Sequence, residues 1–106
     1  DRKKDMIISG GFNIYAADLE AVLRSHPDVT DTAVIAIPSD VWGETPLGFV
    51  VLAENAGSTP EGVCAWANDQ LGKTQRLSKV IAMDELPRSE IGKILKKDLR
   101  APYWDA

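Results

Sequence analysis

A single lysine near the end of the chain has the type and setting best suited to chemistry. Lys93 follows Gly92 in the segment 86–94, which reads Leu-Pro-Arg-Ser-Glu-Ile-Gly-Lys-Ile. A lysine ammonium is a compact charge on a long stem, suited to pairing with carboxylate or phosphate oxygens as negative charge develops. Gly92 lets the backbone approach a ligand closely. We therefore expect Lys93 to carry a cation to an anionic reacting group, although Gly-Lys alone is also typical of an ordinary surface loop.

A pair of glycines near the start of the chain is the second candidate. Gly10 and Gly11 separate two short apolar runs, at residues 6–8 and 12–15. This pattern predicts a β-hairpin with a tight turn. Adjacent glycines also permit positive φ angles and close approach of the backbone to a ligand.

The elements that must position these residues predict an α+β domain. After the hairpin we expect, in chain order, a helix over residues 18–25, strands over 31–37 and 47–52, a helix over 60–71, a strand over 79–83 and a short basic helix. Pro38 should end the first of these strands, and residues 41–44 should form a loop. Thr59 should cap the helix that starts at Pro60, and Gly72 should end it. The expected fold is a small compact domain, with an N-terminal β-hairpin plus a three-stranded sheet packed against helices.

Size and composition limit the function classes. The chain has 106 residues, of which 44% are hydrophobic and 26% are charged, as is typical of one globular domain. The net charge of −4 argues against general nucleic-acid binding. No apolar run approaches the roughly 20 residues of a transmembrane helix.

The single Cys64 cannot form an internal disulfide, which fits a reducing compartment, and we expect a cytoplasmic location. No spacing of His, Cys or acidic residues indicates a metal site.

The two ends of the chain together carry a resemblance to a known family. The opening Asp1-Arg2-Lys3-Lys4-Asp5 and the segment 86–94 resemble motifs of the small C-terminal domain of adenylate-forming enzymes. This family includes acyl-CoA synthetases, luciferases and the adenylation domains of peptide synthetases. The resemblance extends from Asp1 to about Arg100 and implies that the chain is half of an active site.

The resemblance implies three roles in adenylation. Lys93 would enter the site of a large N-terminal domain and contact the substrate carboxylate and the phosphates of ATP. Arg2 would contact the ribose hydroxyls of ATP. Lys4 would be the hinge about which the domain rotates, since a hinge needs only a few residues that absorb a large change in φ and ψ. Taken alone, the run of residues 2–4 would indicate only solvated surface.

The resemblance also implies contacts with CoA. After rotation, Gly10 and Gly11 would line the tunnel for the pantetheine arm, with Gly11 as the favoured contact. Trp42 could stack on the adenine of CoA, or it could lie at the rim of the core, and the sequence leaves both readings open.

The chain departs from the family at two places. Residues 15–20 read Tyr-Ala-Ala-Asp-Leu-Glu where the family has Tyr-Pro-x-Glu-Ile-Glu, so the helix entry loses a proline. The acid of that motif is kept as Glu20, to which we assign a structural role. Residues 74–77 read Thr-Gln-Arg-Leu in place of the common Tyr-Lys-x-Pro, which puts the CoA contacts there in doubt. Arg76 or Lys79 remains as a candidate phosphate contact.

The resemblance therefore predicts that residues 1–106 are the mobile C-terminal domain of an ATP-dependent, AMP-forming acyl-CoA synthetase, such as a long-chain fatty acid–CoA ligase. Its substrate would be a fatty or aromatic carboxylic acid. ATP, Mg²⁺ and CoA would be bound mainly by the protein's own large N-terminal domain, so the separate domain should be inactive. The chain opens with Asp1 in place of an initiator methionine, and we expect a fragment whose residues 1–5 are the end of the hinge. Attachment to a membrane surface through the large domain is compatible with this prediction.

Two other functions remain open from the sequence. An adenylation domain that loads the phosphopantetheine thiol of a carrier protein would share the same motifs and differ in its acceptor. The run Met-Ile-Ile-Ser-Gly-Gly-Phe-Asn at residues 6–13 favours acyl-CoA synthetases. A non-catalytic α+β binding module would leave the lysine segment and the hinge motif without a purpose.

Overall fold

Two long central strands organise the molecule. The computed structural model describes residues 6–104, apart from the side chain of Thr74. Strand β3 (Val29–Ser39) pairs antiparallel with β4 (Gly43–Leu52) along nearly their whole length. Their central residues are buried in succession, from Ala33 to Ile35 in β3, because both faces of the sheet are covered. A continuous apolar run of this kind is typical of a fully buried strand.

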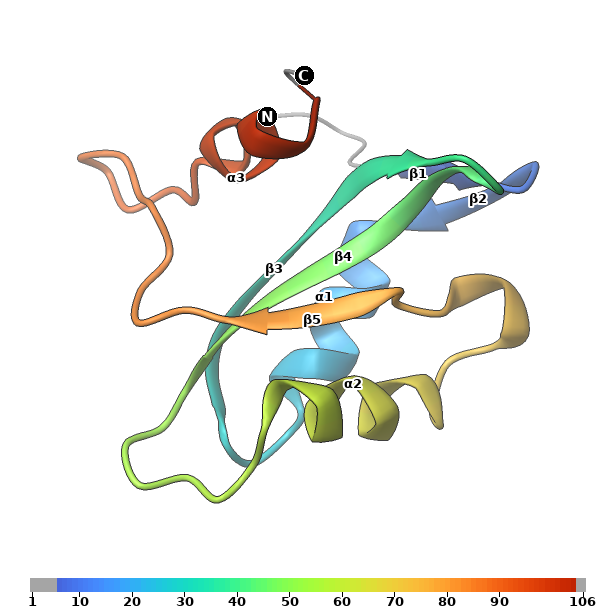
Figure 1. Ribbon diagram of the computed structural model, residues 1–106. Helices are drawn as coiled ribbons and strands as arrows, with labels where there is room; N and C mark the ends of the chain where they lie inside the picture. Colours follow the sequence, from blue (N-terminus) through green and yellow to red (C-terminus); the bar gives the residue numbers. More distant parts are fainter. Residues whose placement is uncertain (1–5, 105–106) are drawn as a thin grey trace.

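The predicted hairpin and one further strand join this pair to form a five-stranded sheet (Figure 1). Strands β1 (Met6–Ser9) and β2 (Phe12–Tyr15) are antiparallel, and β1 meets β4 where Ser9 lies opposite Gly43. Strand β5 (Lys79–Ala82) pairs with β4 in the parallel direction. The strand order is β2-β1-β4-β3, with β5 also on β4. The α+β fold class is confirmed, and the hairpin and the three-stranded sheet are parts of one mixed sheet.

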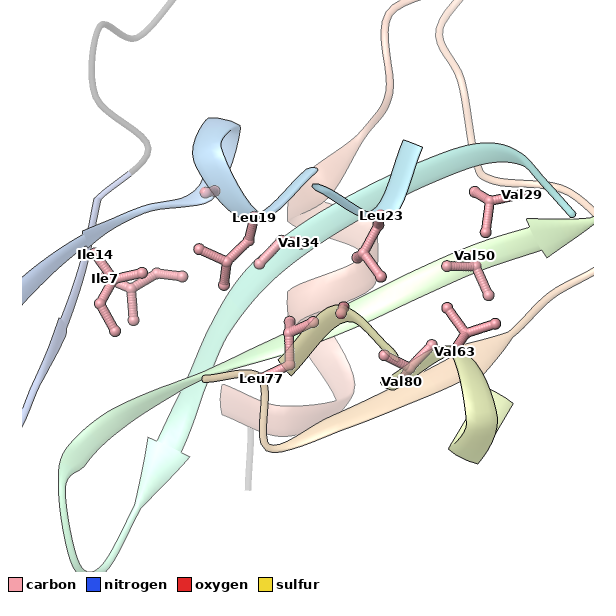
Figure 2. Packing of buried hydrophobic residues seen from close by; sticks show 12 residues of the cluster. Ile7, Ile14, Leu19, Leu23, Val29, Val34, Val50, Val63, Leu77 and Val80 are labelled. Atoms are coloured by element: carbon pink, nitrogen blue, oxygen red, sulfur yellow. The ribbon is translucent and has the colours of Figure 1, made fainter. Parts of the chain in front are cut away.

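Helices cover both faces of the sheet. Helices α1 (Ala16–Arg24) and α2 (Pro60–Asn68) pack on one face, where Leu19, Leu23 and Val63 are fully buried against the strands (Figure 2). Helix α3 (Lys96–Trp104) covers the other face, with Leu99 in a second buried cluster. The indole Nε1 of Trp104 donates a hydrogen bond to the backbone oxygen of Ala36 over 2.8 Å, which fixes the end of α3 to β3.

The structure corrects two sequence-based boundaries. Pro38 does not end β3, which continues to Ser39 with Pro38 opposite Glu44, so β4 already begins within the predicted loop 41–44. β3 is an edge strand, and a missing backbone N–H is tolerated at an edge. Gly72 is not the C-cap of α2, because that helix ends at Asn68 with Asp69 as its C-cap.

The start of α2 agrees with the prediction. The hydroxyl of Thr59 accepts a hydrogen bond from the N–H of Gly62 over 3.0 Å, as an N-cap should, and Pro60 is the first helical residue. At the other end, the side-chain amide of Asn68 donates to the backbone oxygen of Leu77 and accepts from its N–H. This pair of hydrogen bonds ties the segment after α2, including the short 3-10 helix η1 (Lys73–Gln75), back onto the end of the helix.

No helix within residues 6–104 has the length and apolar character needed to cross a membrane.

Candidate functional site

The segment that carries Lys93 forms a closed loop between β5 and α3. Arg88 and Ile94 form an antiparallel bridge at its base, and we call residues 88–94 the lysine loop. Within it, the N–H of Ser89 donates to the oxygen of Lys93, and the N–H of Gly92 donates to the oxygen of Ser89, each over 2.9 Å. These backbone bonds close the loop on itself, so it is ordered from within.

Lys93 lies on the exposed part of this loop. Residues 90–93 are all exposed, and the neighbouring Ile91 has 87% of its surface accessible. Gly92 adopts a φ of 86°, the left-handed region that favours glycine, so the turn itself requires this residue type. The backbone N–H of Lys93 also lies 3.3 Å from the hydroxyl oxygen of Ser89. The fold thus presents Lys93 on a protruding turn, while its catalytic role remains a prediction.

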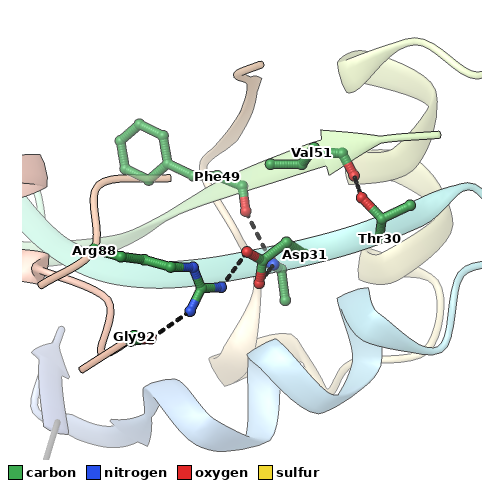
Figure 3. Close-up of polar contacts among 7 residues, drawn as sticks. Thr30, Asp31, Phe49, Val51, Arg88 and Gly92 are labelled. Carbon is green, nitrogen blue, oxygen red and sulfur yellow. Dashed lines mark hydrogen bonds and ion pairs between the residues drawn. The ribbon is translucent and has the colours of Figure 1, made fainter. Parts of the chain in front are cut away.

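One arginine connects the lysine loop to the sheet (Figure 3). The Nη1 of Arg88 donates a hydrogen bond to the backbone oxygen of Gly92 over 2.7 Å. The Nη2 of the same guanidinium donates to Oδ2 of Asp31 on β3 and forms an ion pair with it. The sequence offers no signal for a role of Arg88, because its partner is 57 residues away.

The glycine pair and Trp42 come together at another site. Gly10 and Gly11 form a two-residue turn with φ angles of 58° and 85°, as expected for the tight hairpin turn with two positive φ angles. The N–H of Gly10 donates to the backbone oxygen of Trp42 over 2.8 Å. A Cβ placed on Gly10 would lie only 2.8 Å from Cε3 of the indole, so the ring packs directly on this glycine.

Trp42 is held in an exposed position there. Its side chain has 57% of its surface accessible, and the hydroxyl of Ser39 accepts hydrogen bonds from the N–H groups of Val41 and Trp42. Other exposed apolar residues of the hairpin and the β3–β4 turn are Ile8, Phe12, Tyr15 and Val41. An exposed ring braced by a glycine turn could stack on a flat ligand.

The two sites are well separated. Figure 1 shows the hairpin at one side of the sheet and the lysine loop at the other, beside α3. The structure therefore brings Gly10, Gly11 and Trp42 together but does not bring Lys93 near them. Arg2 and Lys4, the predicted ribose contact and hinge, lie outside the described residues.

A third feature is a hollow of about 460 Å³ between α2 and β5. Its lining includes Arg76 and Lys79, the candidate phosphate contacts, together with Cys64 and the acidic Glu61 and Asp69. Burial raises the pKa of the Cys64 thiol, so this cysteine is protonated at neutral pH and is a poor nucleophile. The hollow thus combines charges of both signs with a protonated thiol.

Glu20 links three elements at the edge strand β3. Its Oε2 accepts a hydrogen bond from the N–H of Val34 over 2.9 Å and lies 2.7 Å from the Nζ of Lys96. These contacts join α1, β3 and the start of α3, so Glu20 has a structural role.

Among residues 6–104, no group of three or more His, Cys, Asp or Glu side chains is placed to hold a metal ion, so we assign none of them to Mg²⁺.

Comparisons with family models and with curated proteins agree on the family to which the chain is similar. A family described as AMP-binding enzyme C-terminal domain matches residues 18–93. The 2-succinylbenzoate–CoA ligase of Geobacillus kaustophilus is 39% identical over 100 residues, which are 94% of this chain and 20% of the relative. The 4-coumarate–CoA ligase 1 of Arabidopsis thaliana is 40% identical over 101 residues, which are 95% of this chain and 18% of the relative.

Solved structures agree in fold. ATP-bound MatB from Rhodopseudomonas palustris superposes with a TM-score of 0.91 at 36% identity, covering 98% of this chain and 21% of that one. A fatty acyl CoA synthetase of Mycobacterium tuberculosis gives 0.86 at 40% identity, covering 97% of this chain and 20% of that one. The chain thus spans about a fifth of the length of these relatives. With this fold and these matches, the chain belongs to the AMP-binding enzyme C-terminal domain family.

Proposed function

We propose that the chain is the mobile C-terminal domain of an AMP-forming acyl-CoA synthetase. In the first half-reaction a carboxylate oxygen attacks the α-phosphorus of ATP, the bond to the β-phosphate bridging oxygen breaks, and pyrophosphate leaves. In the second, the CoA sulfur attacks the acyl carbon and AMP leaves. The observation that carries the proposal is the protruding, internally bonded loop that presents Lys93, in a chain of this family.

Lys93 would serve the first half-reaction. Two anions must approach each other, and negative charge then builds on the phosphorane oxygens and the departing pyrophosphate. A lysine ammonium delivered into a closed, water-poor site stabilises that charge, and deleting one such contact typically costs about 3–4 kcal/mol of transition-state stabilisation. Mg²⁺ bound with ATP would share the neutralisation of the phosphates. Arg2 would contact the ATP ribose and Lys4 would be the hinge, as the family resemblance implies.

The hairpin end would serve the second half-reaction. The Gly10–Gly11 turn would line the pantetheine tunnel, with its backbone close to the thiol arm. Trp42 would stack on the adenine of CoA, an interaction suited to an exposed indole. Arg76 or Lys79, from the hollow beside β5, would contact a CoA phosphate. The binding of ATP and CoA would otherwise depend mainly on the large domain.

The substrate we propose is a fatty or aromatic carboxylic acid. Relatives are named for 2-succinylbenzoate and 4-coumarate, and a structural neighbour is named a fatty acyl CoA synthetase. Aromatic acids should therefore be tested beside long-chain fatty acids. CoA is the favoured acceptor over a carrier protein, because these relatives are named as CoA ligases. A cytoplasmic location remains a prediction from the single free cysteine.

The test is ATP–pyrophosphate exchange by the full-length parent protein, wild type against Lys93→Ala, over a panel of aromatic and fatty acids. We expect exchange that depends on one class of acid and collapses in the variant, while thioester formation from supplied acyl-AMP persists. Free CoA and a phosphopantetheinylated carrier protein are compared as acceptors. Equal loss of both half-reactions in Lys93→Ala would contradict the assigned role, and no exchange with any acid would reject adenylation.

A further inference from the structure

The position of Lys93 depends on what holds its loop against the rest of the domain. A lysine side chain is long and flexible, so accurate delivery of its ammonium requires a fixed backbone beneath it. The loop's backbone bonds join Ser89 to Gly92 and Lys93, and the N–H of Leu95 donates to the oxygen of Pro87 over 2.9 Å. All of these bonds lie within one short segment, so they set the shape of the loop but not its direction relative to the sheet.

Ile94, at the base of the lysine loop, packs against the second buried cluster, and the Arg88 guanidinium adds a polar connection from the sheet to the backbone beside Lys93. One terminal nitrogen donates a hydrogen bond to the backbone oxygen of Gly92, next to Lys93, and the other donates to the carboxylate of Asp31 on β3. Asp31 is itself fixed, because it pairs with Val51 in the sheet and its Oδ1 accepts the N–H of Thr32 over 3.0 Å. A planar, fork-shaped donor can hold two acceptors at once in a defined geometry, which a single ammonium cannot do.

We infer that Arg88 is a positioning residue for adenylation, which holds the Lys93 backbone in the direction needed to reach the reacting phosphate. This inference rests on the function proposed above. Arg88 acts through the Gly92 oxygen, and Asp31 holds the guanidinium in place. The side chains of Arg88 and Asp31 are 40% and 27% exposed, so the pair is partly screened by water and its value lies in orientation more than in stability.

The experiment uses the full-length parent with the variants Arg88→Gln, Arg88→Lys, Asp31→Asn and the double variant Arg88→Gln/Asp31→Asn. Lys93→Ala is the reference, and Arg24→Gln, an exposed arginine in the last turn of α1, is the matched control. Three quantities are measured: ATP–pyrophosphate exchange, thioester formation from supplied acyl-AMP, and hydrogen–deuterium exchange of the peptide covering residues 86–95.

We expect Arg88→Gln to lower the kcat of exchange about 10- to 100-fold, the scale of a displacement near 1 Å in a reacting group. Thioester formation should change less than about twofold, and amide exchange should rise in residues 86–95 alone. Arg88→Lys should not restore the wild-type rate. Asp31→Asn should act in the same direction, and the double variant should be no slower than Arg88→Gln, since the two residues act as one unit.

Several outcomes would overturn the inference. Unchanged exchange in Arg88→Gln would do so, as would equal loss of both half-reactions, which would indicate a general structural role. Full rescue by lysine would mean that charge alone suffices, and additive effects of the two substitutions would mean that Arg88 and Asp31 act independently. If Lys93→Ala itself leaves exchange intact, the proposed function of Lys93 fails and this inference fails with it. If only Arg88→Gln is silent, the inference fails alone.

Discussion

Replacing Gly10 by alanine should destabilise the domain through two separable effects. Gly10 has a φ of 58°, and an L-residue in this left-handed region costs about 1–2 kcal/mol. The new Cβ would also lie 2.8 Å from Cε3 of Trp42, so the indole must move from its contact. Crowding of this kind typically costs about 1–3 kcal/mol. The total expected loss in the free energy of unfolding is therefore about 2–5 kcal/mol, the sum of the two.

Gly11→Ala is the matched control for this prediction. Gly11 also has a positive φ, of 85°, but a Cβ there meets nothing within 4 Å. The loss in the free energy of unfolding caused by Gly11→Ala should therefore contain only the cost of the strained backbone. The gain from a stiffer unfolded chain is the same for both substitutions and cancels in their difference. That difference isolates the contact with the indole.

Urea unfolding of the 106-residue chain, followed by far-ultraviolet circular dichroism, measures these losses. Wild type, Gly10→Ala, Gly11→Ala, Trp42→Ala and Gly10→Ala/Trp42→Ala complete the comparison. In the Trp42→Ala background, Gly10→Ala should cost no more than Gly11→Ala does in the wild type. Equal losses for the two glycine variants in the wild-type background would refute the reasoning, because the indole would then not pack on Gly10.

Three further predictions concern other parts of the domain. Gly92→Ala should destabilise the native conformation of the lysine loop by about 1–2 kcal/mol, because the φ of residue 92 is 86° and the space around it is open, so that only the backbone is strained. ATP–pyrophosphate exchange by the parent protein should therefore fall, while thioester formation persists. Glu20→Gln should cost about 1–3 kcal/mol in urea unfolding by removing the charge that faces Lys96, and Glu20→Ala should cost more because the N–H of Val34 also loses its acceptor. Because burial raises the pKa of Cys64, its thiolate forms only at a pH above that of an ordinary thiol; labelling by a thiol reagent should be slow at pH 8 and speed up in urea, and equal rates in both conditions would contradict the burial.

Local patterns made much of the fold predictable. The Gly10–Gly11 turn and the Thr59 N-cap are determined by neighbouring residues, and both were predicted from the sequence and agree with the structure. The error at Pro38 arose because proline usually interrupts a strand, whereas its effect depends on whether the strand lies at an edge. Edge position is a property of the whole sheet, which periodicity along one segment does not reveal.

Sequence motifs named the candidate residues, and only the fold shows how they are arranged. Lys93 stood out because of its segment, yet the contact between Arg88 and Asp31 joins residues 57 apart in sequence. Trp42 and Gly10 were separate candidates, and only the pairing of β1 with β4 at Ser9 and Gly43 places them in contact. Such long-range contacts depend on the order of the strands, which the sequence pattern left undetermined.

Strand β3 anchors the two candidate sites near its opposite ends. Asp31, which holds the lysine loop through Arg88, is near one end of β3, and Ser39, which accepts the N–H of Trp42, ends the strand. Ser39 is eight positions after Asp31, so at about 3.3 Å per residue the two anchors lie roughly 26 Å apart. On the proposed function, the two half-reactions use opposite ends of one strand, which agrees with the proposal that the domain turns between them.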